Sequence, residues 1–162
     1  FLPYASSTGN TTDQLYDLGV LEDQLYLFYR SGLLICYNLK SHQEIYRQKL
    51  PDELPKGKYE NTSYVVPGNN TFYQLRNGNQ GGVMLNYDIT RKKWNIVFQT
   101  DYRLNSLSID KDSSIWVSCY MGLWNIDAGL INKQYIPNLK LVDGRTINTE
   151  VSTLYNLSLI HI

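Results

Sequence analysis

The chain has 162 residues, 43% of them hydrophobic and 13% aromatic, with 14 tyrosines and 11 glycines. Its 15 basic side chains balance 15 acidic ones, and this zero formal net charge gives no electrostatic reason to expect a nucleic acid or an anionic membrane as partner. Tyrosine and glycine richness favours a sheet-rich globular fold, and no apolar run approaches the roughly 18 residues of a membrane-spanning helix.

The first group of predicted strands lies within residues 14–50. Apolar side chains alternate with polar ones through most of it, which is the pattern of half-buried antiparallel strands. Its strands are predicted at residues 14–18, 25–29, 32–38 and 44–47. Pro51, Pro55 and Gly57 then interrupt the pattern, so residues 51–62 are predicted to be a connection.

Two further groups follow at residues 63–100 and 101–140. The second group has predicted strands at 63–66, 71–75, 82–88 and 94–98, with a glycine- and asparagine-rich loop over 77–81. The third group has predicted strands at 104–109, 114–119, 122–126 and 134–136. No segment combines a 3.6-residue apolar period with caps, so no helix is expected.

One pattern is common to the three groups: an alternating strand, a short glycine loop, and a second alternating strand that ends on Asp or Asn. Tyr26, Tyr73 and Trp116 occupy the same place in the three copies and lie 47 and 43 residues apart. A period of roughly 40 to 50 residues with several short strands per repeat is typical of a β-propeller blade. The predicted fold class is therefore all-β, a partial β-propeller of about three four-stranded antiparallel blades plus the first strand of a fourth.

The predicted blades divide the chain as follows. Blade one is residues 14–50, blade two 63–100, blade three 101–140, and the start of blade four 141–156, with its first strand at 151–155. Residues 1–13 are expected to be a linker or the end of a preceding blade, and residues 157–162 a non-native tail. Because a propeller ring usually needs four to eight blades, we expect the chain to be a segment of a longer protein.

Several repeated residues are predicted to serve the scaffold. We expect Tyr26, Tyr73 and Trp116 to pack between blades. Turns with positive φ are expected at Gly32, Gly82 and Gly122. Asp110 and Asp127 belong to the repeat, and Asp110 and Asp112 are expected in a tight turn where Asp caps its own backbone. Cys36 and Cys119 are predicted to be buried free thiols, because two isolated cysteines make neither a disulfide framework nor a zinc site.

The residues do not predict a reaction centre. His42 falls in a predicted hairpin turn, and nucleophilic catalysis commonly needs a histidine beside the nucleophile. No phosphate-binding loop, dinucleotide-binding motif or histidine–cysteine metal cluster is present in the sequence. We therefore expect no catalytic residue, no metal and no cofactor in this chain.

Ligand binding is expected at one end of the blades. In a four-stranded antiparallel blade, the loop between strands two and three lies at the same end as the connection to the next blade. Rings stack on the apolar faces of sugars, while amides and guanidinium groups bind hydroxyls or carboxylates. The residues predicted to contact a ligand there are Tyr29, Arg30, Arg76, Asn77, Asn79, Gln80 and Tyr120.

Residues Leu104–Asp127 resemble the two-component regulator propeller repeat. The turn aspartate matches Asp110, the apolar-Trp-apolar core matches Ile115–Val117, and the Gly-Leu pair and final aspartate match Gly122, Leu123 and Asp127. Ser113 departs from the usual turn glycine. Blades one and two keep the spacing and the glycine but carry Tyr in place of Trp, so the resemblance extends loosely over residues 14–156.

The resemblance implies the periplasmic sensor region of an inner-membrane hybrid two-component histidine kinase of the Bacteroidetes type. Such sensors have two seven-bladed propellers and commonly respond to oligosaccharides by switching on glycan-utilisation genes. It further implies a homodimer of the full-length sensor, with membrane anchoring and kinase activity in parts outside this chain and no nucleic acid bound by this segment. The alternatives are a propeller glycosidase or polysaccharide lyase, and a protein-interaction propeller without a small-molecule ligand.

Overall fold

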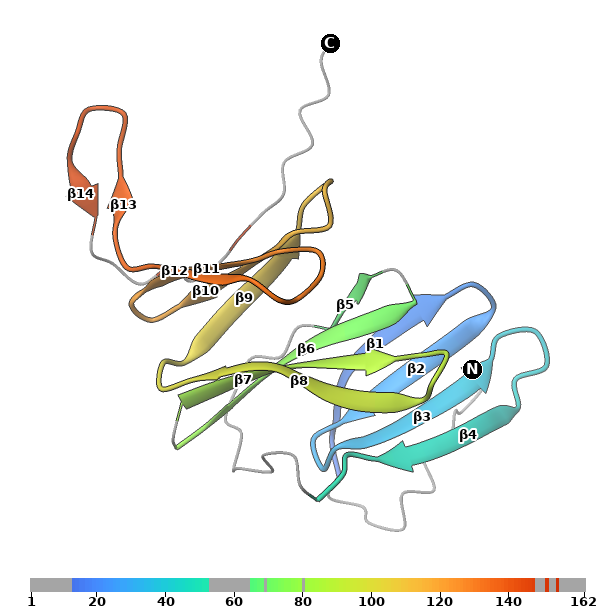
Figure 1. The fold of residues 1–162 in the computed structure, drawn as a ribbon. Coiled ribbons are helices and arrows are strands. Elements are labelled where there is room, and N and C mark those ends of the chain that lie inside the picture. The colour runs from blue at the N-terminus through green and yellow to red at the C-terminus, as the bar shows by residue number, and fades with distance from the viewer. Residues whose placement is uncertain are drawn as a thin grey trace. The chain divides into compact units, whose positions relative to one another are not determined.

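The alternating segments of the sequence form antiparallel strands, which Figure 1 shows gathered into separate four-stranded sheets. The computed structural model describes residues 13–52, 65–68, 70–79, 81–147, 151 and 154. Within these residues every regular element is a strand and there is no helix. Three sheets have four strands each, joined in sequence order with every neighbouring pair antiparallel. The prediction of an all-β chain with three four-stranded blades is confirmed.

Blade one is built from the first four strands. These are β1 (Leu15–Leu21), β2 (Gln24–Tyr29), β3 (Leu33–Asn38) and β4 (Glu44–Lys49). Strands β2 and β3 are buried on both faces, because their leucines, isoleucine and aromatic residues leave almost no polar side. Leu34, Ile35 and Cys36 are fully buried, whereas β4 is mostly exposed. The two middle strands therefore carry the apolar interior of this blade.

Blades two and three repeat this arrangement. The strands of blade two are β5 (Val65–Gly68), β6 (Thr71–Gly78), β7 (Gly81–Asp88) and β8 (Lys93–Thr100). Those of blade three are β9 (Leu104–Ile109), β10 (Ile115–Cys119), β11 (Gly122–Ile126) and β12 (Lys133–Ile136). A separate two-stranded hairpin follows, made of β13 (Leu139–Lys140) and β14 (Thr146–Ile147), and Figure 1 shows it standing apart from the sheet of blade three.

The chain divides into two compact parts, Phe1–Lys56 with blade one and Gly57–Ile162 with blades two and three. In the second part, one hydrophobic core joins the two blades. Its fully buried members include Leu75 and Met84 from blade two and Leu104, Ile115 and Val117 from blade three. Each sheet shields apolar side chains of its neighbour, which is how adjacent propeller blades stabilise each other.

A buried amide adds hydrogen bonds to the contact between blades two and three. Asn77 on β6 donates from Nδ2 to the carbonyl oxygen of Leu104 on β9 at 2.7 Å, and its Oδ1 accepts from the Leu104 N–H at 2.8 Å. Asn77 is 5% exposed and Leu104 is fully buried. The side chain thus pairs with a strand backbone of the next blade as a neighbouring strand would.

The structure corrects the loop predicted at residues 77–81. Strands β6 and β7 pair as far as Gly78 and Gly81, so the connection is a tight turn, and Arg76 and Asn77 lie in a buried strand. Positive φ is found at Gly81 (105°) and not at Gly82, so the backbone prediction for Gly82 is wrong by one residue. Strand β6 continues through the buried polar residues Arg76 and Asn77 to Gly78, where a loop was predicted.

The segment after blade three also differs from the expectation. Hairpin β13–β14 occupies residues where only the approach to a fourth blade was predicted. Of the strand predicted at 151–155, Val151 and Leu154 lie outside any strand, and the other three residues fall outside the described part of the chain. Both described residues are held against β9: Asn105 Nδ2 donates to the Val151 carbonyl oxygen at 3.1 Å, and the Leu154 N–H donates to Ser106 Oγ at 3.2 Å.

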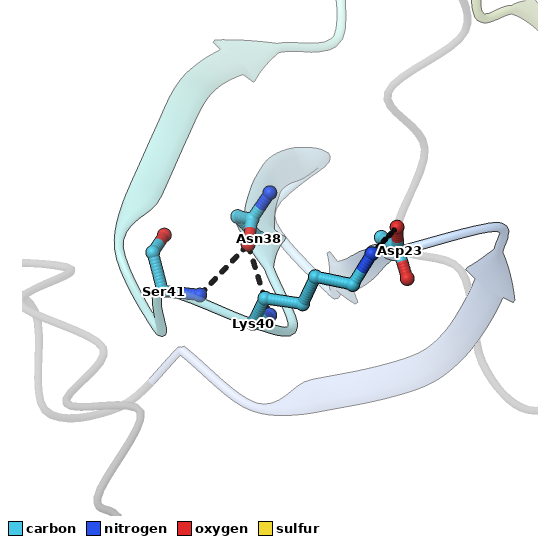
Figure 2. Close-up of polar contacts among 4 residues, drawn as sticks. All are labelled: Asp23, Asn38, Lys40 and Ser41. Carbon is cyan, nitrogen blue, oxygen red and sulfur yellow. Dashed lines mark hydrogen bonds and ion pairs between the residues drawn. The ribbon is translucent and has the colours of Figure 1, made fainter.

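The Asp or Asn that ends the third strand of each blade caps the turn that follows. In blade one, Asn38 Oδ1 accepts hydrogen bonds from the backbone N–H groups of Lys40 and Ser41 at 2.9 and 2.8 Å, and Lys40 forms an ion pair with Asp23 across the end of the sheet (Figure 2). Asp88 and Asp127 accept equivalent backbone bonds in blades two and three. This end of each blade is therefore occupied by turn-forming contacts.

Candidate functional site

The candidate site lies at the opposite end of the blades, which we call the loop end. In blades two and three it comprises the β6–β7 turn, the β10–β11 turn at residues 120–121, and the connection at residues 101–103 between β8 and β9. The register places these segments together, because Gly82 pairs with Thr100 and Cys119 pairs with both Leu104 and Gly122. The Tyr120 N–H donates to the Arg103 carbonyl oxygen at 3.1 Å, which ties the β10–β11 turn to the connection.

The predicted ligand-binding residues in the second part of the chain fall into two classes. Arg76 and Asn77 are 3% and 5% exposed on β6, and Asn77 is engaged with Leu104. Asn79 is exposed in the β6–β7 turn, and Tyr120 is 56% exposed in the β10–β11 turn. Gln80 lies outside the described residues. The accessible side chains at the loop end therefore come from the turns. The predicted residues on β6 are buried, and Asn77 contacts the next blade.

The two predicted residues of blade one also differ from each other. Tyr29 is 4% exposed and belongs to the blade-one hydrophobic cluster, so its side chain is part of the interior. Arg30 is exposed, and its backbone N–H and Nη1 donate to the backbone and side-chain oxygens of Gln14. The neighbouring Ser31 is bonded to Asp13. The residues just before β1 therefore occupy the hydrogen-bonding groups of this turn.

Four aromatic rings form a continuous row at the loop end. None of them was predicted to contact a ligand. The ring centroids are 5.2 Å apart for Phe98 and Trp124, 5.0 Å for Trp124 and Tyr135, and 5.7 Å for Tyr135 and Tyr102. The last pair is stacked at an interplanar angle of 17°. The row begins at Phe98, 7% exposed, and ends at Tyr102, 38% exposed. It connects the core to the surface.

The outer end of this row is held in place by strands. Tyr135 Oη donates to the Met121 carbonyl oxygen at 2.7 Å. The Tyr102 backbone passes so close to β7 that a methyl group on Gly82 would lie 2.9 Å from the Tyr102 carbonyl oxygen and 2.5 Å from Leu104 Cγ. Glycine is required at that position by this close approach of the connection. The Tyr102 backbone is therefore packed directly against β7.

Two ionisable groups beneath this surface, Tyr135 and Cys119, stay neutral near pH 7. Burial, together with the neighbouring Cys119 and Tyr102, raises the pKa of Tyr135 above its usual value of 10. Burial likewise raises the pKa of the Cys119 thiol above 9, and this sulfur donates to the Gly122 carbonyl oxygen. Both groups are therefore protonated at neutral pH, where they can donate hydrogen bonds and pack.

Three properties of the described residues bear on other kinds of site. Cys36 and Cys119 are buried, and neither takes part in a disulfide. Among those residues, no three His, Cys, Asp or Glu side chains gather as metal ligands would. None of the segments whose structure is described forms a helix long and apolar enough to cross a membrane.

The comparisons with known proteins bear on the fold. No family model matches the sequence, and no curated protein matches it. The structure is similar to the β-propeller domain of Cps50 (Swd1) from Myceliophteria thermophila, with a TM-score of 0.54 and 10% identity over 87% of this chain and 44% of that one. The chain is part of a β-propeller. At this identity the likeness concerns architecture alone.

Two further solved structures are similar at lower scores. Hsv2 from Kluyveromyces lactis has a TM-score of 0.46 and 16% identity, over 78% of this chain and 38% of that one. The extracellular domain of BT4673 from B. thetaiotaomicron, assigned to a one-component system, has a TM-score of 0.39 and 13% identity, over 87% of this chain and 24% of that one. The chain spans less than half the length of each of these structures.

Proposed function

We propose that this chain is a ligand-sensing, periplasmic propeller segment of a membrane-bound hybrid two-component histidine kinase, responding to oligosaccharides and regulating glycan-utilisation genes. The observation that carries the proposal is the repeat at Leu104–Asp127. Its matching residues Asp110, Gly122 and Asp127 lie at the three turns that shape blade three: Asp110 accepts from the Lys111 N–H, Gly122 has a φ of 143°, and Asp127 caps the β11–β12 turn. Sequence resemblance and blade geometry therefore coincide.

The role proposed for the segment itself is binding without catalysis. Its accessible loop-end side chains include Tyr102 and Tyr120. Asp101 and Arg103 are exposed in the same connection as Tyr102, and Asn79 is exposed in the β6–β7 turn. Rings that can stack on a sugar, with hydrogen-bonding groups beside them, suit recognition of an uncharged polyhydroxylated ligand. Ligand binding outside the membrane would then bias the arrangement of paired sensors and so the activity of the kinase.

A binding experiment and a genetic one test the proposal. The purified chain is titrated by isothermal calorimetry with neutral oligosaccharides of six residues, and we expect saturable binding to at least one of them. The same mixtures are assayed for new reducing ends, and release of these would contradict a non-catalytic role. The reading frame that encodes the chain is expected to include a membrane helix and histidine kinase motifs. Absence of both binding and kinase motifs would overturn the proposal.

A further inference from the structure

We infer that the stacked pair Tyr102–Tyr135 is the platform on which a sugar ring of the ligand lies, and that the ligand is a neutral oligosaccharide of glucose or xylose configuration. The inference rests on the proposed function and deepens it by naming the contact residue and the sugar class. Tyr102 lies in the connection between blades two and three, outside every repeated motif of the sequence. The contact therefore comes from the junction of the blades.

The geometry leaves one side of Tyr102 available. One ring face is taken by Tyr135 in a parallel stack at 5.7 Å, yet Tyr102 remains 38% exposed. The platform we infer is the part of the exposed Tyr102 ring that Tyr135 does not cover. Pyranoses whose substituents are all equatorial present a flat face of axial C–H groups, as in glucose and xylose, and such a face suits an open aromatic ring.

Rigidity of the platform favours binding. Tyr135 is anchored twice, by its hydroxyl bond to the Met121 carbonyl oxygen and by contact with Trp124, which packs against the core shared by blades two and three. The Tyr102 N–H donates to Thr100 Oγ1 at 3.3 Å. A ring that is already held in its bound position loses little conformational entropy when a ligand arrives.

The charges around the ring favour a neutral ligand over an ionic one. Asp101 and Arg103 flank Tyr102 in the chain and are both exposed, so the connection that carries the platform has one negative and one positive side chain. Such a pair gives no net attraction for an anion or a cation, but both groups can hydrogen-bond sugar hydroxyls. Tyr120, 56% exposed, adds a second ring in the turn that is bonded to Arg103.

The test is calorimetric titration of the purified 162-residue chain with cellohexaose and xylohexaose. Tyr102→Ala and Tyr102→Leu are expected to raise the Kd by about fivefold to tenfold, the size of one aromatic contact, whereas Tyr102→Phe should stay within about twofold. Tyr135→Phe keeps the ring but loses the bond to Met121, and as a positioning change it should weaken binding by less than Tyr102→Ala. Ile131→Ala, an exposed residue of the opposite end, should leave the Kd unchanged.

The possible outcomes separate the two proposals. If the chain binds either sugar and neither Tyr102→Ala nor Tyr102→Leu weakens binding, the platform is refuted while the sensing function stands. If the chain binds neither sugar but binds a charged or mannose-configured oligosaccharide, the sugar class is refuted. If it binds no oligosaccharide at all, both proposals fall. Circular dichroism of each variant verifies folding, and Tyr102→Leu, which keeps an apolar side chain but removes the aromatic face, keeps the comparison decisive should Tyr102→Ala unfold.

Discussion

Replacement of Asn77 by alanine should loosen the junction between blades two and three. The Asn77 amide makes two buried hydrogen bonds of 2.7 and 2.8 Å to the backbone of Leu104. Its removal leaves one N–H and one C=O unpaired at a residue that is fully buried. Each unsatisfied buried group costs about 1–3 kcal/mol, so we expect the free energy of unfolding to fall by about 2–5 kcal/mol.

Urea unfolding followed by tryptophan fluorescence measures this loss in the relevant part of the chain. The three tryptophans, Trp94, Trp116 and Trp124, all lie in blades two and three. With a urea slope of about 2 kcal/mol per molar, the expected loss lowers the midpoint by about 1–2.5 M. The matched control is Asn79→Ala, which removes the same amide from an exposed turn position two residues away and should change stability by less than about 0.5 kcal/mol.

A second variant, Asn77→Asp, tests the direction of the hydrogen bonds. An ionised carboxylate could still accept from the Leu104 N–H but could not donate to its carbonyl, and burial would raise its pKa above the unfolded value. The folded variant would then bind a proton that the unfolded chain releases. Relative to wild type, its stability should therefore be greatest at low pH and decline as pH rises through the folded pKa. The hydrogen-bonded junction would be refuted if Asn77→Ala lost no more stability than Asn79→Ala. It would also be refuted if the stability of Asn77→Asp rose, rather than fell, with increasing pH.

Three further predictions concern local geometry. Gly82→Ala should lower the free energy of unfolding by about 1–3 kcal/mol in urea titration, because the new methyl group would lie 2.5 Å from Leu104 Cγ and 2.8 Å from Asn77 Oδ1. Gly129→Ala is the control, since its nearest contacts would be at 3.7 Å, and an equal loss in both variants would contradict the steric explanation. Ser113→Gly should stabilise by about 0.5–1 kcal/mol in thermal unfolding, because Ser113 has a φ of 66° that glycine adopts without strain; a loss of stability would contradict this reading. Asp127→Ala should lower the urea midpoint at pH 7 and reduce the acid sensitivity of unfolding. Hydrogen bonds from the Ile131 N–H, and to a smaller extent from Asn132, lower the pKa of Asp127 below 3.8. The stability that the Asp127 cap contributes is therefore present above pH 3.8 and is lost as pH falls through the lower folded pKa. Identical pH profiles of stability for Asp127→Ala and wild type would contradict the cap.

The candidate site was only partly predictable from the sequence. Tyr120 could be placed at the loop end because it falls in the short turn between two alternating strands, and the structure finds it exposed there. Arg76 and Asn77 could not be assigned correctly, because a polar end of a buried strand looks like a loop when its partner in the next blade is unknown. The end of β6 carried no such signal, because its polar and apolar residues do not alternate and residues 74–77 are all buried.

Most strands, most turns and the repeat number of the described blades could be predicted from the sequence alone, because each depends on neighbours a few residues away. Alternation places side chains on the two faces of a strand, and Asn38, Asp88 and Asp127 cap turns with their own side chains. Only the tertiary structure decided that Asn77 meets Leu104 and that Tyr102 stacks on Tyr135. These partners lie 27 and 33 residues apart, on different elements, and no local pattern encodes which side chains of two packed sheets face each other.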